Sequence, residues 1–258
     1  MHNARKQEHF LVVDIGNTTI QLAVGRGRRC LFIRTLRSGL VPKVLRDVIR
    51  EYLQKIRGNI EEVVVCSVAP AITRQIVPIF QKVVKQKIRL VGRDITVPIK
   101  NRYDDPRQVG QDRLVGAYAA VRLYGAPLIV VDLGTAITLD VISRSGEYRG
   151  GIIIPGLNLS VQALYQGTAL LPHVLVKPPQ QVIGRNTQDS ILSGIFYGYG
   201  AMIDGLIVKL SKKIAARPKI VMTGGHAGLM KKFFQHKVMI EPHLVLKGLC
   251  LLQSGTKD

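Results

Sequence analysis

The chain has 258 residues, of which 47% are hydrophobic and 21% are charged. This composition supplies enough apolar surface for a folded core and argues against a disordered chain. The polar stretch Met1–His9 lacks the apolar segment of a secretory signal, and no unbroken apolar run reaches the roughly 18 residues that span a bilayer. We therefore expect a cytoplasmic protein with no membrane partner.

The formal net charge of +20 raises the question of an anionic partner such as nucleic acid. The basic residues are spread along the whole chain. The two denser groups, Arg26–Arg29 and Lys82–Arg89, are short and contain no aromatic residues on which bases could stack. The pattern indicates a generally basic surface and argues against nucleic acid as a partner.

The cysteines and histidines form no recognisable metal or disulfide pattern. Cys30, Cys66 and Cys250 are far apart in sequence and odd in number, and the six histidines show no paired spacing. We expect reduced thiols and no structural transition metal.

Strand and helix patterns alternate along the chain. Phe10–Val24 predicts a strand, a tight turn and a second strand, and Pro42–Arg57 has the apolar spacing of an amphipathic helix. The elements that we expect after these are a strand at Glu62–Val68, a helix at Thr73–Lys85, a strand at Ile88–Val91, a helix at Asp112–Tyr124 and a strand at Leu128–Val131. This order is typical of an α/β protein.

The chain contains an internal repeat. Leu11–Val24 reads LVVDIGNTTIQLAV and Ile129–Ile142 reads IVVDLGTAITLDVI, with an Asp-x-Gly turn after an apolar strand in both. We therefore predict two similar halves, residues 10–118 and 119–255, with a cleft between them.

The first copy of this turn suits phosphate binding. Gly16 allows close approach of the backbone, and the amides of such a turn can form an anion-binding nest. The carboxylate of Asp14 would repel phosphate unless a cation such as the Mg²⁺ carried by ATP lay between them. An ordinary hairpin turn is the alternative, and the second copy argues against it. The candidate residues are Asp14, Ile15, Gly16, Asn17, Thr18 and Thr19.

Two further segments could complete a nucleotide site. The second copy places Asp132, Gly134 and Thr135 in a loop that would oppose the first. Gly224 and Gly225 follow a short apolar run, and a glycine pair there would let the main chain pass flat against a planar ligand such as adenine. The same pair also occurs in many plain strand-to-helix turns.

Gly110-Gln111-Asp112-Arg113 precedes a predicted helix and allows two interpretations. Asp112 could simply cap the helix N-terminus, where an anion is stabilised. It could instead orient and deprotonate an attacking hydroxyl, with Arg113 pairing with a substrate carboxylate. The spacing alone leaves both open.

Together these motifs resemble those of type III pantothenate kinases. The matching pieces are DIGNT at Asp14–Thr18, GQDR at Gly110–Arg113, DLGTA at Asp132–Ala136, GGIIIPGLNLSVQALYQGTALLP at Gly150–Pro172, GRNT at Gly184–Thr187 and TGGHA at Thr223–Ala227. The resemblance covers about Phe10 to Leu251. It implies the duplicated ribonuclease H-like fold shared by actin, sugar kinases and heat-shock ATPases.

The resemblance also implies a reaction, in which ATP phosphorylates pantothenate in the first step of coenzyme A synthesis. Asp112 would accept the proton, and Asp132 would bind the K⁺ or NH₄⁺ that the family requires. Asp14 would hold Mg²⁺ with ATP. The positions implied for pantothenate are Tyr103, Gly110, Gln111, Asp112, Arg113 and Thr187, and those implied for ATP are the Asp14–Thr19 turn with Gly134, Thr135, Gly224 and Gly225. Members of the family are homodimers, and the GGIIIPG segment is expected near the interface.

Some features depart from the family pattern. His226 stands where many members have an acidic residue, residues 1–9 extend beyond the usual start, and the charge is unusually positive. A basic regulatory or nucleic-acid-associated protein on the same fold is therefore one alternative, although a pure binder would not need Asp14, Asp112 and Asp132 together. The second alternative is another sugar-kinase-like phosphotransferase or a polyphosphate phosphatase. Either protein would be expected to lack the GQDR and GRNT motifs.

Overall fold

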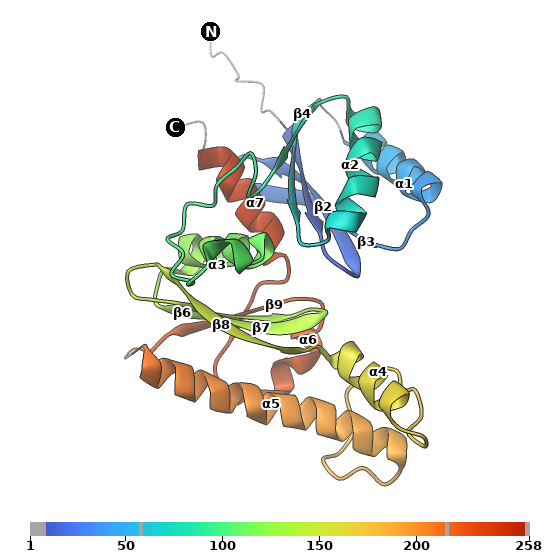
Figure 1. Ribbon diagram of the computed structural model, residues 1–258, viewed down its shortest axis with the longest axis vertical. Helices are drawn as coiled ribbons and strands as arrows, with labels where there is room; N and C mark the ends of the chain where they lie inside the picture. Colours follow the sequence, from blue (N-terminus) through green and yellow to red (C-terminus); the bar gives the residue numbers. More distant parts are fainter. Residues whose placement is uncertain (1–8, 57–58, 215–216, 256–258) are drawn as a thin grey trace. The chain divides into compact units, whose positions relative to one another are not determined.

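The computed structural model describes residues 9–56, 59–214 and 217–255. The chain forms two compact units (Figure 1). Among the described residues, unit 1 comprises His9–Pro98, Arg107–Ala119 and Leu244–Gly255, and unit 2 comprises Ile99–Pro106 and Ala120–His243. Each unit contains one five-stranded sheet.

This division differs from the predicted halves at Ala119, which belongs to unit 1, and in two longer segments. Residues 99–106 belong to unit 2, and the C-terminal helix α7 (Leu244–Gly255) belongs to unit 1. Helix α7 packs against strands of the unit 1 sheet, and the absence of a side chain at Gly248 lets it approach Val115 and Ala119 closely. Contacts between residues so far apart in sequence leave no local pattern.

The unit 1 sheet has the strand order β3-β2-β1-β4-β5. Its strands are β1 (His9–Ile15), β2 (Thr19–Arg26), β3 (Arg29–Arg37), β4 (Ile60–Ser67) and β5 (Lys87–Leu90). The first three form an antiparallel meander, whereas β4 pairs parallel to β1 and β5 parallel to β4. The ends of β1 and β4 therefore lie side by side, and Asp14 is aligned with Cys66.

Helices α1 (Pro42–Gln54) and α2 (Pro70–Val84) cover one face of this sheet (Figure 1). Both begin with proline, which suits the first helical position because its missing N–H has no helical partner there. Their buried residues, including Leu45, Ile49 and Phe80, pack on Leu11, Val13 and other strand residues to form one apolar core. The predicted helix Pro42–Arg57 ends earlier, at Gln54, and Arg57 lies outside the described residues.

Unit 2 repeats the topology of unit 1. Its sheet has the order β10-β9-β6-β7-β8. The strands are β6 (Leu128–Leu133), β7 (Ala136–Ile142), β8 (Tyr148–Pro155), β9 (Lys219–Thr223) and β10 (Met239–Ile240). Strands β6, β7 and β8 form the antiparallel part, and β9 and β10 add in parallel. Each of the two repeated sequences thus forms the first hairpin of its sheet, which confirms the predicted duplication.

The remaining helices are α3 (Gln111–Tyr124), α4 (Leu157–Gly167), α5 (Thr187–Lys213) and the short α6 (Ala227–Met230), with 3₁₀ turns η1 (Pro106–Gln108) and η2 (Lys231–Phe233). Helices α4, α5 and α6 contribute to the core of unit 2, where Phe196 and Ile203 of α5 are fully buried. Figure 1 shows the long α5 running beneath the sheet of this unit.

Within the described residues, α5 is the one helix whose length and composition would allow it to cross a membrane. Its sequence contains no unbroken apolar run of that length, because Asp189, Asp204 and Lys209 interrupt it. Half of its most apolar stretch is buried inside the unit. Core packing therefore accounts for the apolar character of α5.

Candidate active site

The turn that follows β1 is held by backbone and side-chain contacts. The Gly16 N–H donates to the Thr19 carbonyl over 2.9 Å, and the Ser38 hydroxyl donates to the Gly16 carbonyl over 3.0 Å. Asp14 is half-buried at the end of the strand, whereas Asn17, Thr18 and Thr19 are exposed. The turn is thus fixed in shape and presents polar side chains at its surface.

Asp112 lies in the first turn of α3 and is half-buried. Its Oδ1 accepts a hydrogen bond of 2.7 Å from the Arg113 N–H. A Cβ on Gly110 would lie 2.5 Å from the same oxygen and 3.3 Å from Val68 Cγ1. Gly110 therefore leaves room for the carboxylate, which lies within the first turn of α3 and contacts the backbone there.

Asp14, which is aligned with Cys66 on the neighbouring strand, and Asp112 both act electrostatically on the Cys66 thiol in unit 1. The thiol is fully buried, and its pKa is raised by that burial and further by the negative charges of Asp14 and Asp112. Both carboxylates are therefore within electrostatic reach of one sulfur atom. The connection that follows Cys66 reaches both motifs, because the Val68 N–H donates to the Ile15 carbonyl and the Val68 side chain packs at Gly110.

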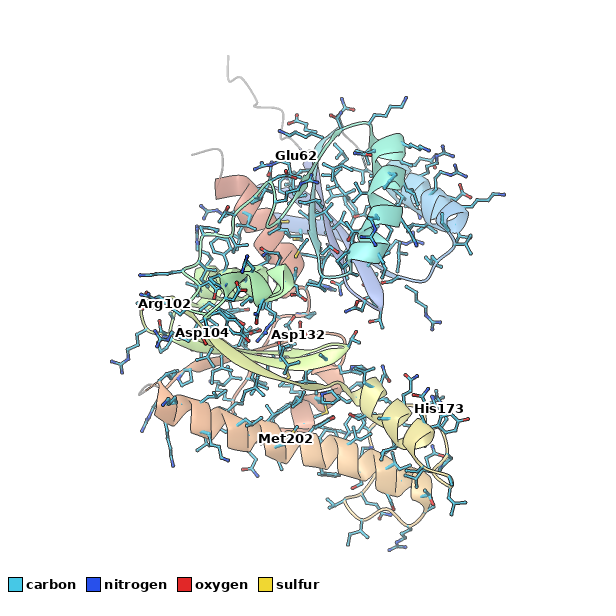
Figure 2. All side chains as sticks on the ribbon, viewed as in Figure 1. Glu62, Arg102, Asp104, Asp132, His173 and Met202 are labelled. Atoms are coloured by element: carbon cyan, nitrogen blue, oxygen red, sulfur yellow. The ribbon has the colours of Figure 1, made fainter. Side chains whose placement is uncertain are left out.

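In unit 2, three loops meet at Asp132 (labelled in Figure 2). Gly224 has a positive φ of +90°, and a Cβ there would lie 2.4 Å from Asp132 Oδ1 and 2.6 Å from the Leu133 carbonyl carbon. The His226 N–H donates to the Leu133 carbonyl over 3.1 Å. Gly224 thus covers the Asp132 carboxylate.

The third loop is the end of the GGIIIPG segment. The Gly156 N–H donates to the Thr135 carbonyl over 3.1 Å, and a Cβ on Gly156 would lie 2.3 Å from that oxygen and 2.5 Å from the Gly134 carbonyl oxygen. The start of α4 is therefore packed directly on the Asp132–Thr135 turn. This contact links two motifs that are about 20 residues apart in the sequence, DLGTA at Asp132–Ala136 and the GGIIIPG segment.

His226 is half-buried in this group, and burial lowers its pKa, so the ring is neutral near pH 7. Its Nε2 lies 3.5 Å from Asn158 Nδ2, and its Nδ1 is buried without a hydrogen-bond partner.

Tyr103 and Thr187, both predicted at the pantothenate site, lie in different places within unit 2. Tyr103 lies beside the buried Tyr148, with ring centroids 6.4 Å apart, and against Gly150. Thr187 is the exposed first residue of α5, next to the N-cap Asn186. The start of α5 adjoins α4, near the labelled His173, whereas the labelled Arg102 and Asp104 lie at the other end of the sheet (Figures 1 and 2).

Charged and buried polar groups surround Tyr103. Glu147 forms ion pairs with Arg102 at 2.7 Å, Lys100 at 3.4 Å and Arg149 at 3.7 Å. The hydrogen bond from Arg102 is the main cause that lowers the pKa of Glu147 to about 2. Beneath it, the Tyr148 hydroxyl donates to Asp140 over 2.7 Å in the core. These partners are not evident from the sequence, because β8 was not predicted as a strand.

The carboxylates of Asp14 and Asp132 suit cations that take most of their oxygen ligands from other groups. Within the described ranges, no three His, Cys, Asp or Glu side chains gather as a metal cage. Asp14 and Asp132 each offer a single carboxylate beside turn carbonyls and hydroxyls. Such a donor set fits Mg²⁺ shared with nucleotide phosphates at Asp14 and a monovalent cation at Asp132.

Comparison with known proteins decides the family. The family model described as type III pantothenate kinase matches residues 10–209. A type III pantothenate kinase of Persephonella marina is 37% identical, covering 93% of this chain and 96% of the relative. The enzyme of that name from Dehalococcoides mccartyi is 34% identical over the full length of both chains. The chain belongs to the type III pantothenate kinase family. The predicted resemblance is therefore confirmed, and the family gives no support to the regulatory alternative.

Solved structures show the same fold at low sequence identity. A 2-dehydro-3-deoxygalactonokinase from Sinorhizobium meliloti has a TM-score of 0.58 at 12% identity, covering 96% of this chain and 99% of that one. MreB 5 of Spiroplasma citri, bound to AMPPNP, has a TM-score of 0.55 at 11% identity, with 98% of each chain covered. These matches confirm the predicted actin-like ATPase fold.

Proposed function

We propose that this protein transfers the γ-phosphoryl group of ATP to the primary hydroxyl of pantothenate, giving 4′-phosphopantothenate and ADP in the first step of coenzyme A synthesis. Membership of the kinase family carries this proposal. The connection after β4 supports it, because Val68 contacts both the end of β1 next to Asp14 and Gly110 next to Asp112, and phosphoryl transfer needs phosphate-binding and proton-accepting groups close together.

Asp112 would act as the general base. As the pantothenate oxygen forms its bond to the γ-phosphorus, the bond from that phosphorus to the β-bridging oxygen breaks, and the hydroxyl proton passes to the Asp112 carboxylate. The transition state of phosphoryl transfer is loose, so positioning contributes more than the strength of the base. A carboxylate has several acceptor positions, so the hydrogen bond that Asp112 Oδ1 accepts from the Arg113 N–H is compatible with a role as base.

Other residues would bind the two substrates. The Asp14–Thr19 turn would hold ATP phosphates through its amides, and Gly134, Thr135, Gly224 and Gly225 would contact the nucleotide. Arg113 would pair with the pantothenate carboxylate, with Tyr103, Gly110 and Gln111 as further contacts. Mg²⁺ at Asp14 and K⁺ or NH₄⁺ at Asp132 would neutralise phosphate charge. A cytoplasmic location remains a prediction.

We further propose a homodimer. Unit 2 exposes a set of large apolar side chains in α4 and in the segment between α4 and α5: Leu159 (41% exposed), Tyr165 (50%), Leu170 (91%), Leu175 (76%), Val182 (60%) and Ile183 (78%). Exposed apolar residues gathered in this way are typical of an interface. A partner subunit would also explain why Thr187 lies away from Tyr103 within one chain.

The substrate assignment is tested by product analysis. Purified protein is incubated with ATP, Mg²⁺, K⁺ and either pantothenate or pantothenol, which has an alcohol in place of the carboxylate. Mass spectrometry should find phosphopantothenate, and pantothenol should react much more slowly because it cannot pair with Arg113. Equal turnover of both would remove Arg113 from the proposed role, and no phosphorylated product from folded protein would contradict the function.

The dimer is tested by sedimentation of the Leu170→Asp variant. We expect wild type to sediment as a dimer and the variant to shift toward monomer, since a charge would be buried at the interface. Val41→Asp changes an exposed residue of unit 1 that is 64% exposed, and serves as the control. A wild-type monomer, or a Leu170→Asp dimer as stable as the control, would contradict the proposal.

A further inference from the structure

A tight turn follows β5 and is closed at both ends by hydrogen bonds. The Gly92 N–H donates to the Ile95 carbonyl over 2.8 Å, and the Asp94 N–H donates to the Leu90 carbonyl over 2.7 Å. The Asp94 side chain also bonds to Leu90, because its Oδ2 accepts from the Leu90 N–H over 2.8 Å. The backbone from 90 to 95 is therefore held in one shape.

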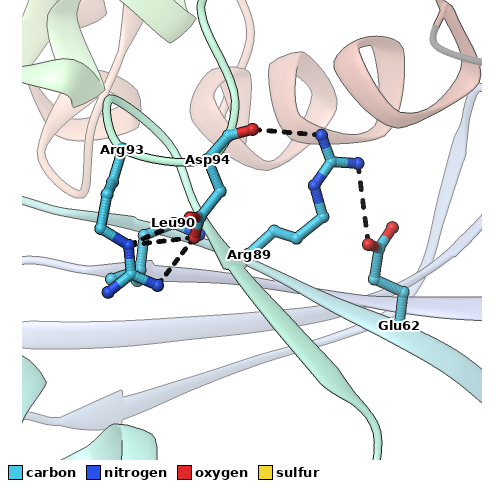
Figure 3. A network of polar contacts seen from close by, with 5 residues as sticks. All are labelled: Glu62, Arg89, Leu90, Arg93 and Asp94. Atoms are coloured by element: carbon cyan, nitrogen blue, oxygen red, sulfur yellow. Dashed lines mark hydrogen bonds and ion pairs between the residues drawn. The ribbon is translucent and has the colours of Figure 1, made fainter.

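Charged side chains brace the same turn (Figure 3). Arg93 pairs with the Asp94 carboxylate at 2.8 Å, and Arg89 donates to the Asp94 carbonyl over 3.3 Å. Arg89 also lies 3.6 Å from Glu62 on the neighbouring strand β4. The hydrogen bond from Arg93, followed by that from the Leu90 N–H, lowers the pKa of Asp94 to about 2, so the carboxylate stays charged at neutral pH. The turn is thus tied to the sheet through Arg89.

Gly92 is the point of this turn that contacts α3. Its φ is +87°, a conformation that residues with a side chain rarely adopt. A Cβ on Gly92 would lie 2.8 Å from Gln111 Cδ, 2.9 Å from its Cγ and 3.1 Å from its Nε2. The Gln111 side chain therefore lies directly against the Gly92 backbone, in space that only glycine leaves open.

Gln111 is the first residue of α3, and Asp112 is the next. The other side of this helix start rests on Val68 at Gly110. Two supports therefore hold the residues around the Asp112 carboxylate, one from the connection after β4 and one from the turn after β5. Neither support carries a side chain assigned to a substrate.

We propose that Gly92 is a positioning residue for phosphoryl transfer: it seats the Gln111 side chain and, through Gln111, fixes the orientation of Asp112. The inference rests on the proposed function, in which Asp112 is the base. It predicts that a Cβ at Gly92 displaces the Gln111 side chain, which can move, in addition to the backbone strain that a positive φ imposes on alanine. The base would then be misaligned while the rest of the site stays intact.

A double-mutant cycle with Gly92→Ala and Gln111→Ala tests this coupling. We expect Gly92→Ala to lower kcat for pantothenate by on the order of tenfold, since small misplacements of a catalytic group are costly. The KM for ATP should stay within about twofold. In the Gln111→Ala background, Gly92→Ala should have no further effect on kcat, because the side chain that it displaces is gone.

Gly27→Ala is the matched control for backbone strain. Gly27 also has a positive φ, +56°, in unit 1, but a Cβ there would meet nothing within 4 Å. Its kcat should equal that of wild type. As a second readout, the acidic limb of the kcat/KM profile should move in Gly92→Ala and not in Gly27→Ala, because the surroundings of Asp112 change only in the former.

The outcomes separate the positioning role from the function itself. A wild-type protein without pantothenate-dependent turnover would overturn the function and the inference with it. An active wild type in which Gly92→Ala behaves like Gly27→Ala, or lowers kcat equally with and without Gln111, would overturn the positioning role alone. If Gly92→Ala does not fold, Asp94→Ala replaces it in the same cycle with the same expectation, because it loosens the turn at an exposed position.

Discussion

Gly224 lies directly over the carboxylate of Asp132, with room for a hydrogen and not for a methyl group. A Cβ would come within 2.4 Å of Asp132 Oδ1, at a backbone φ of +90°. We expect Gly224→Ala to weaken nucleotide binding strongly, because the turn must move away from Asp132. Strain at positive φ adds about 1–2 kcal/mol. Binding of a fluorescent ATP analogue measures the effect.

The nearby Gly228 in α6 supplies the control, because a Cβ there would meet nothing within 4 Å. Gly228→Ala should bind the analogue nearly as wild type does. Similar binding by both variants would show that the tight contact at Asp132 does not shape the nucleotide site.

Asp112→Asn tests the proposed base. The amide cannot accept the hydroxyl proton, so we expect kcat to fall by about 10²–10⁴-fold. Folding and nucleotide affinity should persist. Asp47→Asn, at an exposed position on α1 of the same unit, should leave kcat unchanged. Turnover of Asp112→Asn close to that of wild type would leave Asp112 with only its capping contact to Arg113.

Asp132→Asn tests the proposed monovalent-cation site. Loss of the negative charge should weaken the binding of a cation that relies on one carboxylate. We expect the stimulation of turnover by K⁺ to need much higher K⁺ concentrations in the variant. Initial rates measured against KCl, with ionic strength held constant by NaCl, give the K⁺ concentration that stimulates turnover. An unchanged K⁺ dependence would place the cation elsewhere.

The lowered pKa of Glu147 predicts that acid reduces the stability of the folded protein. Its pKa falls from 4.5 to about 2 in the folded protein. A lowered folded-state pKa stabilises the protein above the unfolded value, and this contribution is lost as the pH falls from about 4.5 toward about 2. Glu147→Gln should therefore lose less stability over this range than wild type. Urea unfolding at several pH values measures it, with Glu61→Gln on β4 as the control. Equal acid sensitivity of Glu147→Gln and wild type would contradict the role of the ion pairs.

Local patterns were sufficient to predict the hairpins that carry Asp14 and Asp132, because buried β-branched runs end at an Asp-x-Gly turn in both. Strand β3 was not predicted, since Phe32 adopts a positive φ of 53° and interrupts its alternation. The assignment of α7 to unit 1 depends on contacts across most of the chain, which no local pattern encodes.

The same limit applies to the site. The motifs around Asp112 and Gly224 were identified from their residues and from the family resemblance. Their supports were not, because the proximity of Cys66 to Asp112 and of Gly92 to Gln111 arises from strand pairing and helix packing. In the sequence, the one local indication of the turn at Gly92 was its position directly after the predicted strand Ile88–Val91.

The most direct test of the central claim is the initial rate of ADP formation with and without pantothenate, in K⁺ and in Na⁺ alone. The proposed function predicts ADP formation that requires pantothenate and is faster in K⁺. Folded protein that binds ATP but forms ADP at the same rate with and without pantothenate would contradict it.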